Sequence, residues 1–477
     1  MERRIRIGLI IDFLSSEYTE LLIEGIKECG HRMNADVFVL QIGQLENPSE
    51  NFDYQCFAAT AFITKNHLDG IVFVSAIENH FVSEKTLLSY IKKFSKIPVV
   101  NITEIIPDVP SIVSEYEIAY TSLIEHIIKD VKARKFLIIT VDDKSDEVVK
   151  REKCIKKVFN QYHISYEKQV VIKSLFSYSK CMNSLTKYES ENPSAKYDFD
   201  AIIALNDDMA AAAIDFFKVR GVDIPEKVVV VGFDDMRKAK LNNPPISTVN
   251  QKVFEQCYVA SRTLYDMIFD KKVPPVQIIQ AKGILRKSSN AENYFRVIQN
   301  NEYLEIDRAA LAGSQSVYSA AEWYKKKTNL FRAAKCLLEM QSSTNKDNMF
   351  NLMDNYLNSF EITNFAIIAY EKPKVEKAMF KSFNLPSKAN LFFYVNRKEN
   401  VVYRYSSDEK ISFNPNNDFL PEEYSNFAHN PILTVPLFVG ETQYGYSVFH
   451  GGKFTKKFCR ENLKCYLCRP KILFDNR

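Results

Sequence analysis

The sequence lacks the short motifs that mark the common catalytic and nucleotide-binding sites. It contains no Walker loop, no GxGxxG after an expected strand, no HExxH and no GxSxG. It also lacks a zinc-binding pattern, because Cys465 and Cys468 form a single CxxC pair where structural zinc usually takes two such pairs. We therefore expect a protein that is not an enzyme and that holds neither a metal nor a cofactor.

No stretch of the sequence approaches the length of a membrane span. The N-terminal arginines precede an apolar run at 7–11, but Asp12 ends this run early and no small-residue cleavage site follows. The nine cysteines are scattered and odd in number, which is typical of reduced thiols rather than a disulfide framework. The net charge of +4 is small for 477 residues and gives no whole-chain argument for nucleic-acid binding. These features predict a cytoplasmic protein with no membrane partner.

The most informative stretch is 200–251, which has the pattern of a strand, a helix and a second strand. Residues 201–205 form a short apolar run, and an alanine-rich segment with helical spacing follows and stops at Gly221. Residues 228–231 form the second run, which is β-branched throughout. Apolar runs without alternation suit a parallel sheet that is covered on both faces. The pattern therefore predicts a βαβ unit.

Short polar residues follow both of these predicted strands. Asn206 and Asp207 come after the first strand, and Asp234 and Asp235 come after the second. In an open parallel sheet, residues just past the carboxyl ends of the strands face a crevice where ligands bind. Their side chains could hydrogen-bond the hydroxyls or ring nitrogens of a ligand. Alternatively, Asn206 or Asp207 only caps the helix, and the spacing favours neither interpretation.

The same stretch resembles the effector-binding core of the LacI/GalR repressor family, whose fold is that of type 1 periplasmic binding proteins. The resemblance is carried by AIIALNDDMAAAAIDFF, RGVDIPEKVVVVGFDD and PPISTVNQ, and it extends over roughly residues 5–288. It implies an α/β fold of two lobes, each a doubly wound parallel sheet, with crossing strands near 100–104, 246–250 and 283–285. The ligand would lie between the lobes, and their closure around it would be the signal.

The resemblance also sets the expected domain boundaries. The ligand-binding domain is expected at 1–288, with lobe one at about 5–103 and 247–283 and lobe two at about 104–246 and 284–288. Residues 289–345 are expected to form a helical connector. Residues 346–477 are expected to form a smaller α+β domain with a basic C-terminal tail, and their layout loosely resembles a GAF-type sensory domain. A turn at Gly440-Glu441 is expected between the last two of its strands, which we predict at 365–370, 391–395, 401–405, 432–438 and 444–449.

Family positions indicate several site residues. Ser16 stands where the family often has an asparagine, and Arg151 stands where the family keeps an arginine that helps hold the ligand. Glu115 is a departure, because the family commonly has aspartate there, and its longer side chain would change the depth of the pocket. Aromatic side chains near the first helix could stack on an apolar ring face of the ligand. The predicted ligand-binding residues are Phe13, Ser16, Tyr18, Phe81, Glu115, Arg151, Asn206, Asp207 and Asp234.

The resemblance implies a cytoplasmic sensor of a sugar or a nucleoside-like molecule, in a signalling or transcription-regulatory protein that forms a homodimer. One alternative is a LacI-type regulator with a non-standard DNA contact, since the first strand begins at about residue 5 and no helix-turn-helix headpiece precedes it. A second alternative is the sensory part of a diguanylate-cyclase-like protein without its catalytic domain. Gly451-Gly452 lacks the acidic residues of a GGDEF loop, so a Mg²⁺ site would have no carboxylate ligands.

Overall fold

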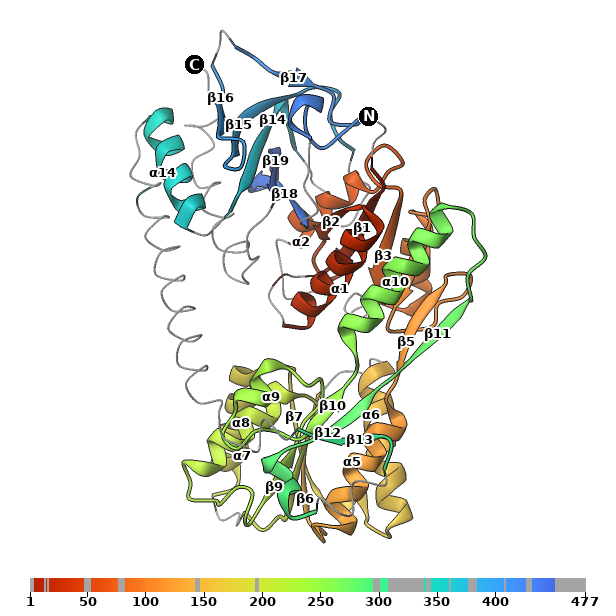
Figure 1. Cartoon of the computed structure of the whole chain (residues 1–477). Helices are drawn as coiled ribbons and strands as arrows, with labels where there is room; N and C mark the ends of the chain where they lie inside the picture. The colour runs from red at the N-terminus through yellow and green to blue at the C-terminus, as the bar shows by residue number, and fades with distance from the viewer. Residues whose placement is uncertain are drawn as a thin grey trace. The chain divides into compact units, whose positions relative to one another are not determined.

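The structure is a computed structural model of the chain, and it divides into two compact units (Figure 1). Unit 1 comprises Met1–Val113, Phe254–Gln277 and Tyr324–Arg477, and unit 2 comprises Ser114–Val253 and Ile278–Trp323. The residues that the structure describes are 4–12, 14, 17–46, 53–75, 82–141, 146–193, 197–294, 301–307, 339, 345–359, 362–375, 384–406, 409–425 and 431–450.

Unit 2 is built on a four-stranded parallel sheet of order β7-β6-β8-β9. Its strands are short apolar runs, namely β6 (Phe136–Val141), β7 (Val170–Ser174), β8 (Ala201–Ala204) and β9 (Val229–Val231). Four helices cover it, namely α5 (Glu117–Lys129), α6 (Asp146–Gln161), α7 (Tyr178–Glu191) and α8 (Asp207–Lys218). Helix α5 packs beside α6 and α7 packs beside α8, on opposite faces of the sheet (Figure 1). The predicted βαβ unit is therefore confirmed as β8-α8-β9.

A small second sheet completes unit 2. Strand β10 (Thr248–Asn250) pairs antiparallel with β12 (Lys282–Leu285), which pairs in parallel with β13 (Leu304–Ile306). The helix predicted from residue 289 onward is therefore wrong at β13. Asn301 starts a turn just before this strand, in which its side-chain oxygen accepts a hydrogen bond from the backbone N–H of Tyr303 at 3.0 Å. Such Asx turns compete with helix formation.

The lobe-one sheet runs β11-β5-β4-β3-β1-β2 and belongs to unit 1, except that the last residues of β5 and β11, from Ser114 and from Ile278 onward, are counted in unit 2. Its strands are β1 (Arg6–Ile11), β2 (Asp36–Gln41), β3 (Gly70–Val74), β4 (Val99–Ile102), β5 (Ser111–Glu115) and β11 (Val276–Gln280). Its helices are α1 (Glu17–Met33), α2 (Asp53–Phe57), which continues as the 3-10 helix η1 (Ala58–Phe62), α4 (Glu84–Lys92) and α10 (Val253–Ile268). Strands β1 to β4 pair in parallel, as the predicted doubly wound lobe requires.

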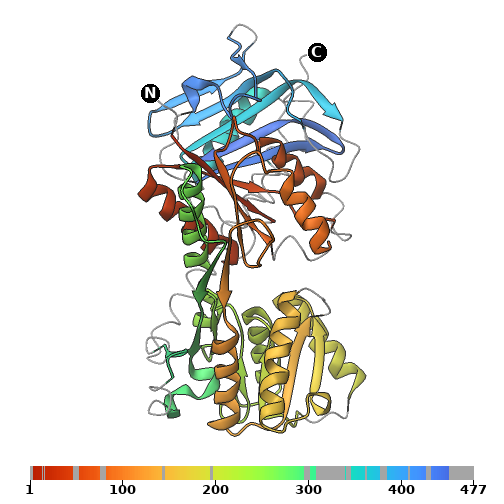
Figure 2. The ribbon, with the colours of Figure 1, turned by 90° about the vertical axis from the view of Figure 1, so that its right-hand side faces the viewer.

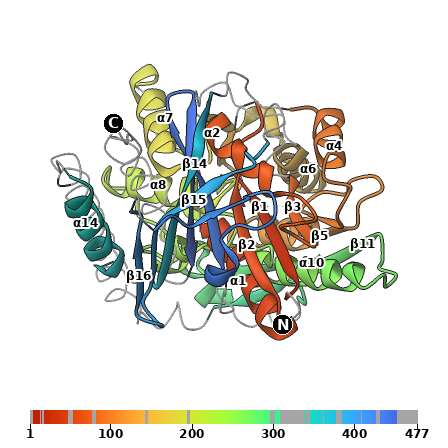
Figure 3. The same cartoon turned by 90° about the horizontal axis from the view of Figure 1, so that it is seen from above.

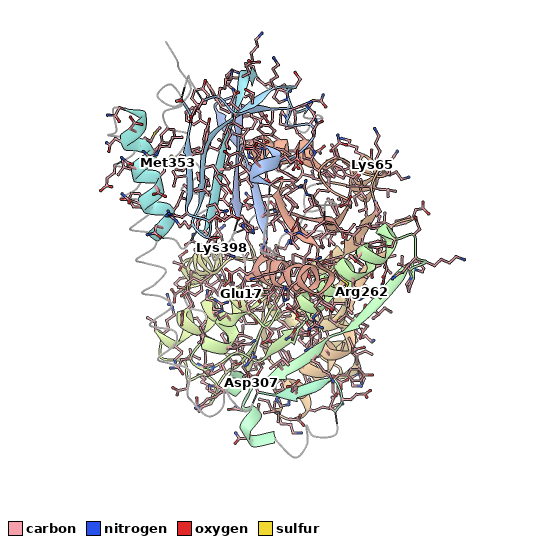
Figure 4. All side chains as sticks on the ribbon, turned by 45° about the horizontal axis from the view of Figure 1, so that its top comes forward. Glu17, Lys65, Arg262, Asp307, Met353 and Lys398 are labelled. Atoms are coloured by element: carbon pink, nitrogen blue, oxygen red, sulfur yellow. The ribbon has the colours of Figure 1, made fainter. Side chains whose placement is uncertain are left out.

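The C-terminal part of unit 1 follows the predicted order of a helix and then strands. Helix α14 (Lys346–Ser359) buries Met353, which Figure 4 labels, and packs Phe350 on the ring of Phe393. The strands are β14 (Asn364–Val375), β15 (Ala389–Asn396), β16 (Val401–Arg404), β17 (Ser412–Phe413), β18 (Ile432–Val439) and β19 (Thr442–His450). They form an antiparallel C-terminal sheet of order β18-β19-β14-β15-β16, with β17 paired to β15. The turn predicted at Gly440-Glu441 is the β18–β19 turn, where Gly440 has a positive φ of 54°.

The two sheets of unit 1 are continuous. Strand β18 pairs in parallel with β2, so that the lobe-one sheet and the C-terminal sheet form one twelve-stranded sheet. Figures 2 and 3 show the blue C-terminal strands side by side with the red strands β1 and β2. The pairing of β18 with β2 is unexpected from the sequence, which predicts a separate domain at residues 346–477.

Candidate ligand-binding site

Four of the five predicted site residues in unit 2 lie at the carboxyl ends of β8 and β9, namely Arg151, Asn206, Asp207 and Asp234. Arg151 reaches this edge from α6, and only 3% of its side chain is exposed. Its Nη1 donates a hydrogen bond to the carbonyl of Leu205, directly after β8. Its Nη2 forms ion pairs with Glu147, one turn earlier on the same helix, and with Oδ1 of Asp234 at 3.4 Å. The fold therefore brings Arg151 and Asp234 together, although 83 residues separate them in the sequence.

An aromatic ring forms the floor beneath this arginine. The guanidinium carbon of Arg151 lies 3.7 Å from the centroid of the Phe233 ring, which is within the range of a cation–π interaction. The rings of Tyr116 and Tyr120 pack edge-on against Phe233, each with a centroid distance of 5.1 Å. Because Phe233 is fully buried, these contacts hold the ring and leave the planar guanidinium in a fixed orientation.

Asp234 has an unusual backbone and a perturbed side chain. Its φ is 106°, which is strained for a residue with a Cβ, and such strain often occurs at functional sites. Its Oδ1 accepts a hydrogen bond from Nε2 of Gln251 at 2.7 Å, and 17% of the side chain remains exposed. Burial raises the pKa of Asp234 to about 7, although the positive charge of Arg151 opposes the rise. Asp234 is thus an acceptor that titrates near neutral pH.

Asp207 lies at the same edge but is engaged within the protein. It is 1% exposed, and its carboxylate accepts hydrogen bonds from Oγ1 of Thr248 at 2.7 Å and from the backbone N–H of Met236 at 2.8 Å. Burial, with a contribution from the charge of Asp234, raises the pKa of Asp207 well above its ordinary value. A Cβ at Gly232 would lie 2.3 Å from Oδ1 of Asp207, so only glycine permits this close approach. Asp207 therefore fastens the loop that carries Asp234.

Asn206 caps helix α8. Its Oδ1 accepts a hydrogen bond from the backbone N–H of Met209 at 2.9 Å, and its backbone is extended, as an N-cap requires. Of the two interpretations that the sequence left open, capping is therefore confirmed for this residue. The cap uses the amide oxygen and leaves the amide nitrogen for other partners.

A buried network of ion pairs holds the loop that follows β9. The guanidinium of Arg286, which is 1% exposed, contacts Oδ1 of Asp235 at 2.6 Å and Oδ2 of Asp307 at 2.8 Å (Asp307 is labelled in Figure 4). It also donates to the carbonyl of Ile246 at 2.9 Å. Ser288 donates to the carbonyl of Val230 at 2.6 Å. Arg286 and Ser288 thus tie the end of the ligand-binding domain to β9 and to the loop after it.

Glu115 has a local structural role in addition to any role toward a ligand. One carboxylate oxygen accepts a hydrogen bond from the backbone N–H of Glu117 at 3.0 Å at the start of α5. The other accepts from Nε2 of Gln280 at 2.8 Å. The longer glutamate side chain therefore joins the start of α5 to strand β11.

The four remaining predicted residues belong to unit 1. Tyr18 lies in the first turn of α1 and is partly buried. Phe13, Ser16 and Phe81 lie outside the described residues. Their proposed stacking and hydrogen-bonding roles therefore stay predictions.

Sequence reasoning missed three residues of the site, namely Glu147, Phe233 and Gln251. Glu147 precedes Arg151 by one helical turn, which is the spacing of an ion pair on a helix and could have been noticed. Phe233 stands between Gly232 and Asp234 and would have been assigned to the core. Gln251 ends the PPISTVNQ motif, but nothing local indicates that its amide reaches Asp234.

Among the residues that the structure describes, no cluster of three or more metal-ligating side chains is present. No helix in the described part of the chain combines the length and hydropathy needed to cross a membrane.

Comparison with known proteins identifies related domains. Residues 125–289 match the family model described as "Periplasmic binding protein-like domain". Catabolite control protein A of Priestia megaterium is 24% identical over 264 residues, which is 54% of this chain and 73% of that protein. The HTH-type transcriptional regulator MalR of Clostridium butyricum is 33% identical over 115 residues, or 24% of this chain, and the match spans only 32% of its length.

Among solved structures, the transcription regulator CcpA of Lactococcus lactis superimposes with a TM-score of 0.50 at 19% identity, covering 60% of this chain and 99% of that one. The chain therefore contains a periplasmic-binding-protein-like domain of the kind found in LacI-family regulators, with the α/β fold that this implies.

Proposed function

We propose that the chain is a small-molecule sensor of a transcription-regulatory or signalling protein and that it is not itself an enzyme. A polar ligand of the sugar or nucleoside type binds at the carboxyl ends of β8 and β9. The proposal rests on one observation, namely the pair of Arg151 and Asp234 at 3.4 Å above the buried ring of Phe233. A fixed donor beside a partly exposed acceptor suits neighbouring hydroxyls of one ligand. As the family resemblance implies, the signal would be closure of the two lobes around the ligand.

Thermal unfolding of the purified chain with and without candidate ligands tests this proposal. The panel contains a pentose, a hexose, a disaccharide and a nucleoside, for example D-ribose, D-glucose, maltose and adenosine. A ligand at about one hundred times its Kd stabilises the native state by about 2.7 kcal/mol, which is a readily measured shift in Tm. The substitution Asp234→Asn should abolish the shift.

Asp208→Asn is the matched control for this experiment. Asp208 also follows β8, but its side chain is 46% exposed and forms a surface ion pair with Lys238 at 3.0 Å. We expect this variant to keep the response to the ligand. A shift that survives Asp234→Asn would remove Asp234 from the site.

A second candidate function is direct binding to DNA, which the name of one relative favours, since MalR is an HTH-type transcriptional regulator. A gel-shift assay with genomic fragments at several salt concentrations tests it. Sequence-specific retention that depends on the ligand would support this function. Binding without sequence preference would count against it, because non-specific affinity follows from phosphate contacts alone.

A further inference from the structure

The edge of the lobe-one sheet is covered by a strand from the far end of the chain. Three consecutive residue pairs join β18 to β2, namely Ile432–Phe38, Leu433–Val39 and Thr434–Leu40. Five of the six residues of β2 are buried. A buried, apolar strand at an open sheet edge would expose unpaired backbone groups and would invite pairing with other chains. Strand β18 supplies the neighbour that β2 would otherwise lack.

An aromatic cluster lies beneath this junction. Phe419 is fully buried and stacks on Phe38 of β2, with a centroid distance of 4.3 Å and an angle of 15° between the rings. It also stacks on Phe62 at 5.0 Å and meets the ring of His67 edge-on at 4.8 Å. Tyr446 packs on Phe62 at 4.7 Å and donates its hydroxyl hydrogen bond to the carbonyl of Phe419 at 2.8 Å. Aromatic rings of lobe one and of the C-terminal part thus pack against one another in one cluster.

Polar side chains also connect lobe one to the C-terminal part at this junction. Arg6, at the start of β1, forms two parallel hydrogen bonds to the carboxylate of Asp418 at 2.8 and 3.1 Å. The side chain of Arg6 is 4% exposed and that of Asp418 is 26% exposed, so the pair is only partly buried. Nε2 of His67 lies 2.8 Å from the carbonyl oxygen of Pro415. Both charged groups of the Arg6–Asp418 pair would regain water if the two parts separated, so this pair fixes the orientation of the junction more than it adds to its stability.

The hydrophobic core of this region does not divide between the two sheets. One contiguous cluster of buried side chains contains Ile10, Phe38, Leu40, Phe62 and Phe73 of lobe one together with Ile368, Leu391, Phe419, Ile432 and Tyr446 of the C-terminal part. An independently folded, appended domain would have its own core and a more polar boundary.

We propose that the C-terminal strands are an obligate part of lobe one and form with it a single rigid body. Any displacement of lobe one that a ligand causes would therefore move the C-terminal sheet as well. This consequence rests on the proposed function, whereas the mechanical coupling stands on the contacts within unit 1 alone.

Hydrogen exchange of the full chain, measured by mass spectrometry without ligand, tests the coupling. The variant Phe419→Ala removes the ring at the centre of the junction. Peptides covering β1 and β2 should then exchange about tenfold faster or more, together with those covering β18 and β19, because one cooperative unit opens as a whole. Unchanged exchange of β1 and β2 in this variant would overturn the proposal.

Phe350→Ala is the matched control. Phe350 is also a buried phenylalanine, but it stacks on Phe393 at 5.0 Å and contacts Phe392 at 5.5 Å, both within the C-terminal part. This variant should accelerate exchange in α14 and β15 before it affects β1. If Phe419→Ala does not fold, Asp418→Asn keeps every ring contact and removes the charge that pairs with Arg6, while the remaining amide oxygen can still accept the hydrogen bond from the backbone N–H of Phe419 at 2.6 Å. Exchange should then increase in β1 as well as around residue 418, and an increase confined to residue 418 would contradict the coupling.

The two proposals can fail separately. Asp234→Asn removes a ligand contact in unit 2 and should leave the exchange of β1 and β2 as in the wild-type chain. If the panel of ligands produces no thermal shift but Phe419→Ala still accelerates β1 and β2, the sensor proposal fails for that panel and the coupling stands. The opposite pair of results would leave a sensor whose C-terminal part is independent.

Discussion

The pKa of Asp234 makes a quantitative prediction about the stability of the protein. In the native state, burial raises this pKa from 3.8 to about 7. The native protein therefore binds the proton more tightly than the unfolded chain does between these values. Stability from this group is fully present below about pH 4 and is lost as the pH rises toward 7. At 1.36 kcal/mol per pKa unit, the loss is at most about 4 kcal/mol.

The variant Asp234→Asn isolates this contribution, because asparagine does not titrate. Urea unfolding followed by circular dichroism between about pH 4.5 and 8 gives the free energy of unfolding of both proteins. The wild-type value should fall relative to that of the variant as the pH rises, by one or more kcal/mol. Asp207 also has a raised pKa and contributes a dependence on pH of the same sign. Because the charge of Asp234 helps to raise the pKa of Asp207, this contribution is smaller in the variant and adds to the expected difference.

A second variant tests the cause of the shift. The negative charge of Glu147 raises the pKa of Asp234 and the positive charge of Arg151 lowers it. Glu147→Gln should therefore lower the pKa of Asp234 and make the loss of stability with pH smaller than in the wild type. If the free energy of unfolding changed equally with pH in the wild type and in Asp234→Asn, the raised pKa of Asp234 would be refuted.

Three further outcomes are expected. Phe233→Leu removes a cation–π contact worth about 0.5–2 kcal/mol from Arg151, and calorimetric titration should show weaker binding of any ligand that shifts the Tm of the wild type. Asn206→Ala removes the N-cap of α8 and should lower the free energy of unfolding by about 1 kcal/mol in urea, whereas Asn206→Asp should restore it. Gly232→Ala forces a Cβ to within 2.3 Å of Oδ1 of Asp207, and scanning calorimetry should show a lower Tm; an unchanged Tm would mean that the loop moves freely.

Much of the local structure could be predicted from the sequence, because each strand is a short apolar run bounded by turn residues. The runs that became β8 and β9 and the turn at Gly440-Glu441 are examples. The convergence of Arg151 and Asp234 came from the family resemblance rather than from periodicity. The burial of Asp207 could not be predicted, because its partners Met236 and Thr248 become neighbours only in the folded sheet.

The union of the two sheets is a different case. The residues of β2 would be apolar whichever strand lay beside them, so nothing in DVFVLQ indicates that its neighbour is β18. The sequence of a strand indicates which of its two faces are buried. It contains no comparable pattern that identifies the strand that will pair with its hydrogen-bonding edge. Local sequence patterns therefore do not predict which distant strands pair with each other.

The order in which a ribosome makes the chain gives the β2–β18 pairing a further consequence. At about 5–20 residues per second, Ile432 emerges roughly 20–80 s after Gln41. Throughout that interval the nascent first lobe presents an uncovered apolar strand to the rest of the cell. Newly made copies that are still on neighbouring ribosomes can meet at that strand before their own last segment arrives. We expect the yield of correctly folded protein to depend on whatever shields the strand during synthesis.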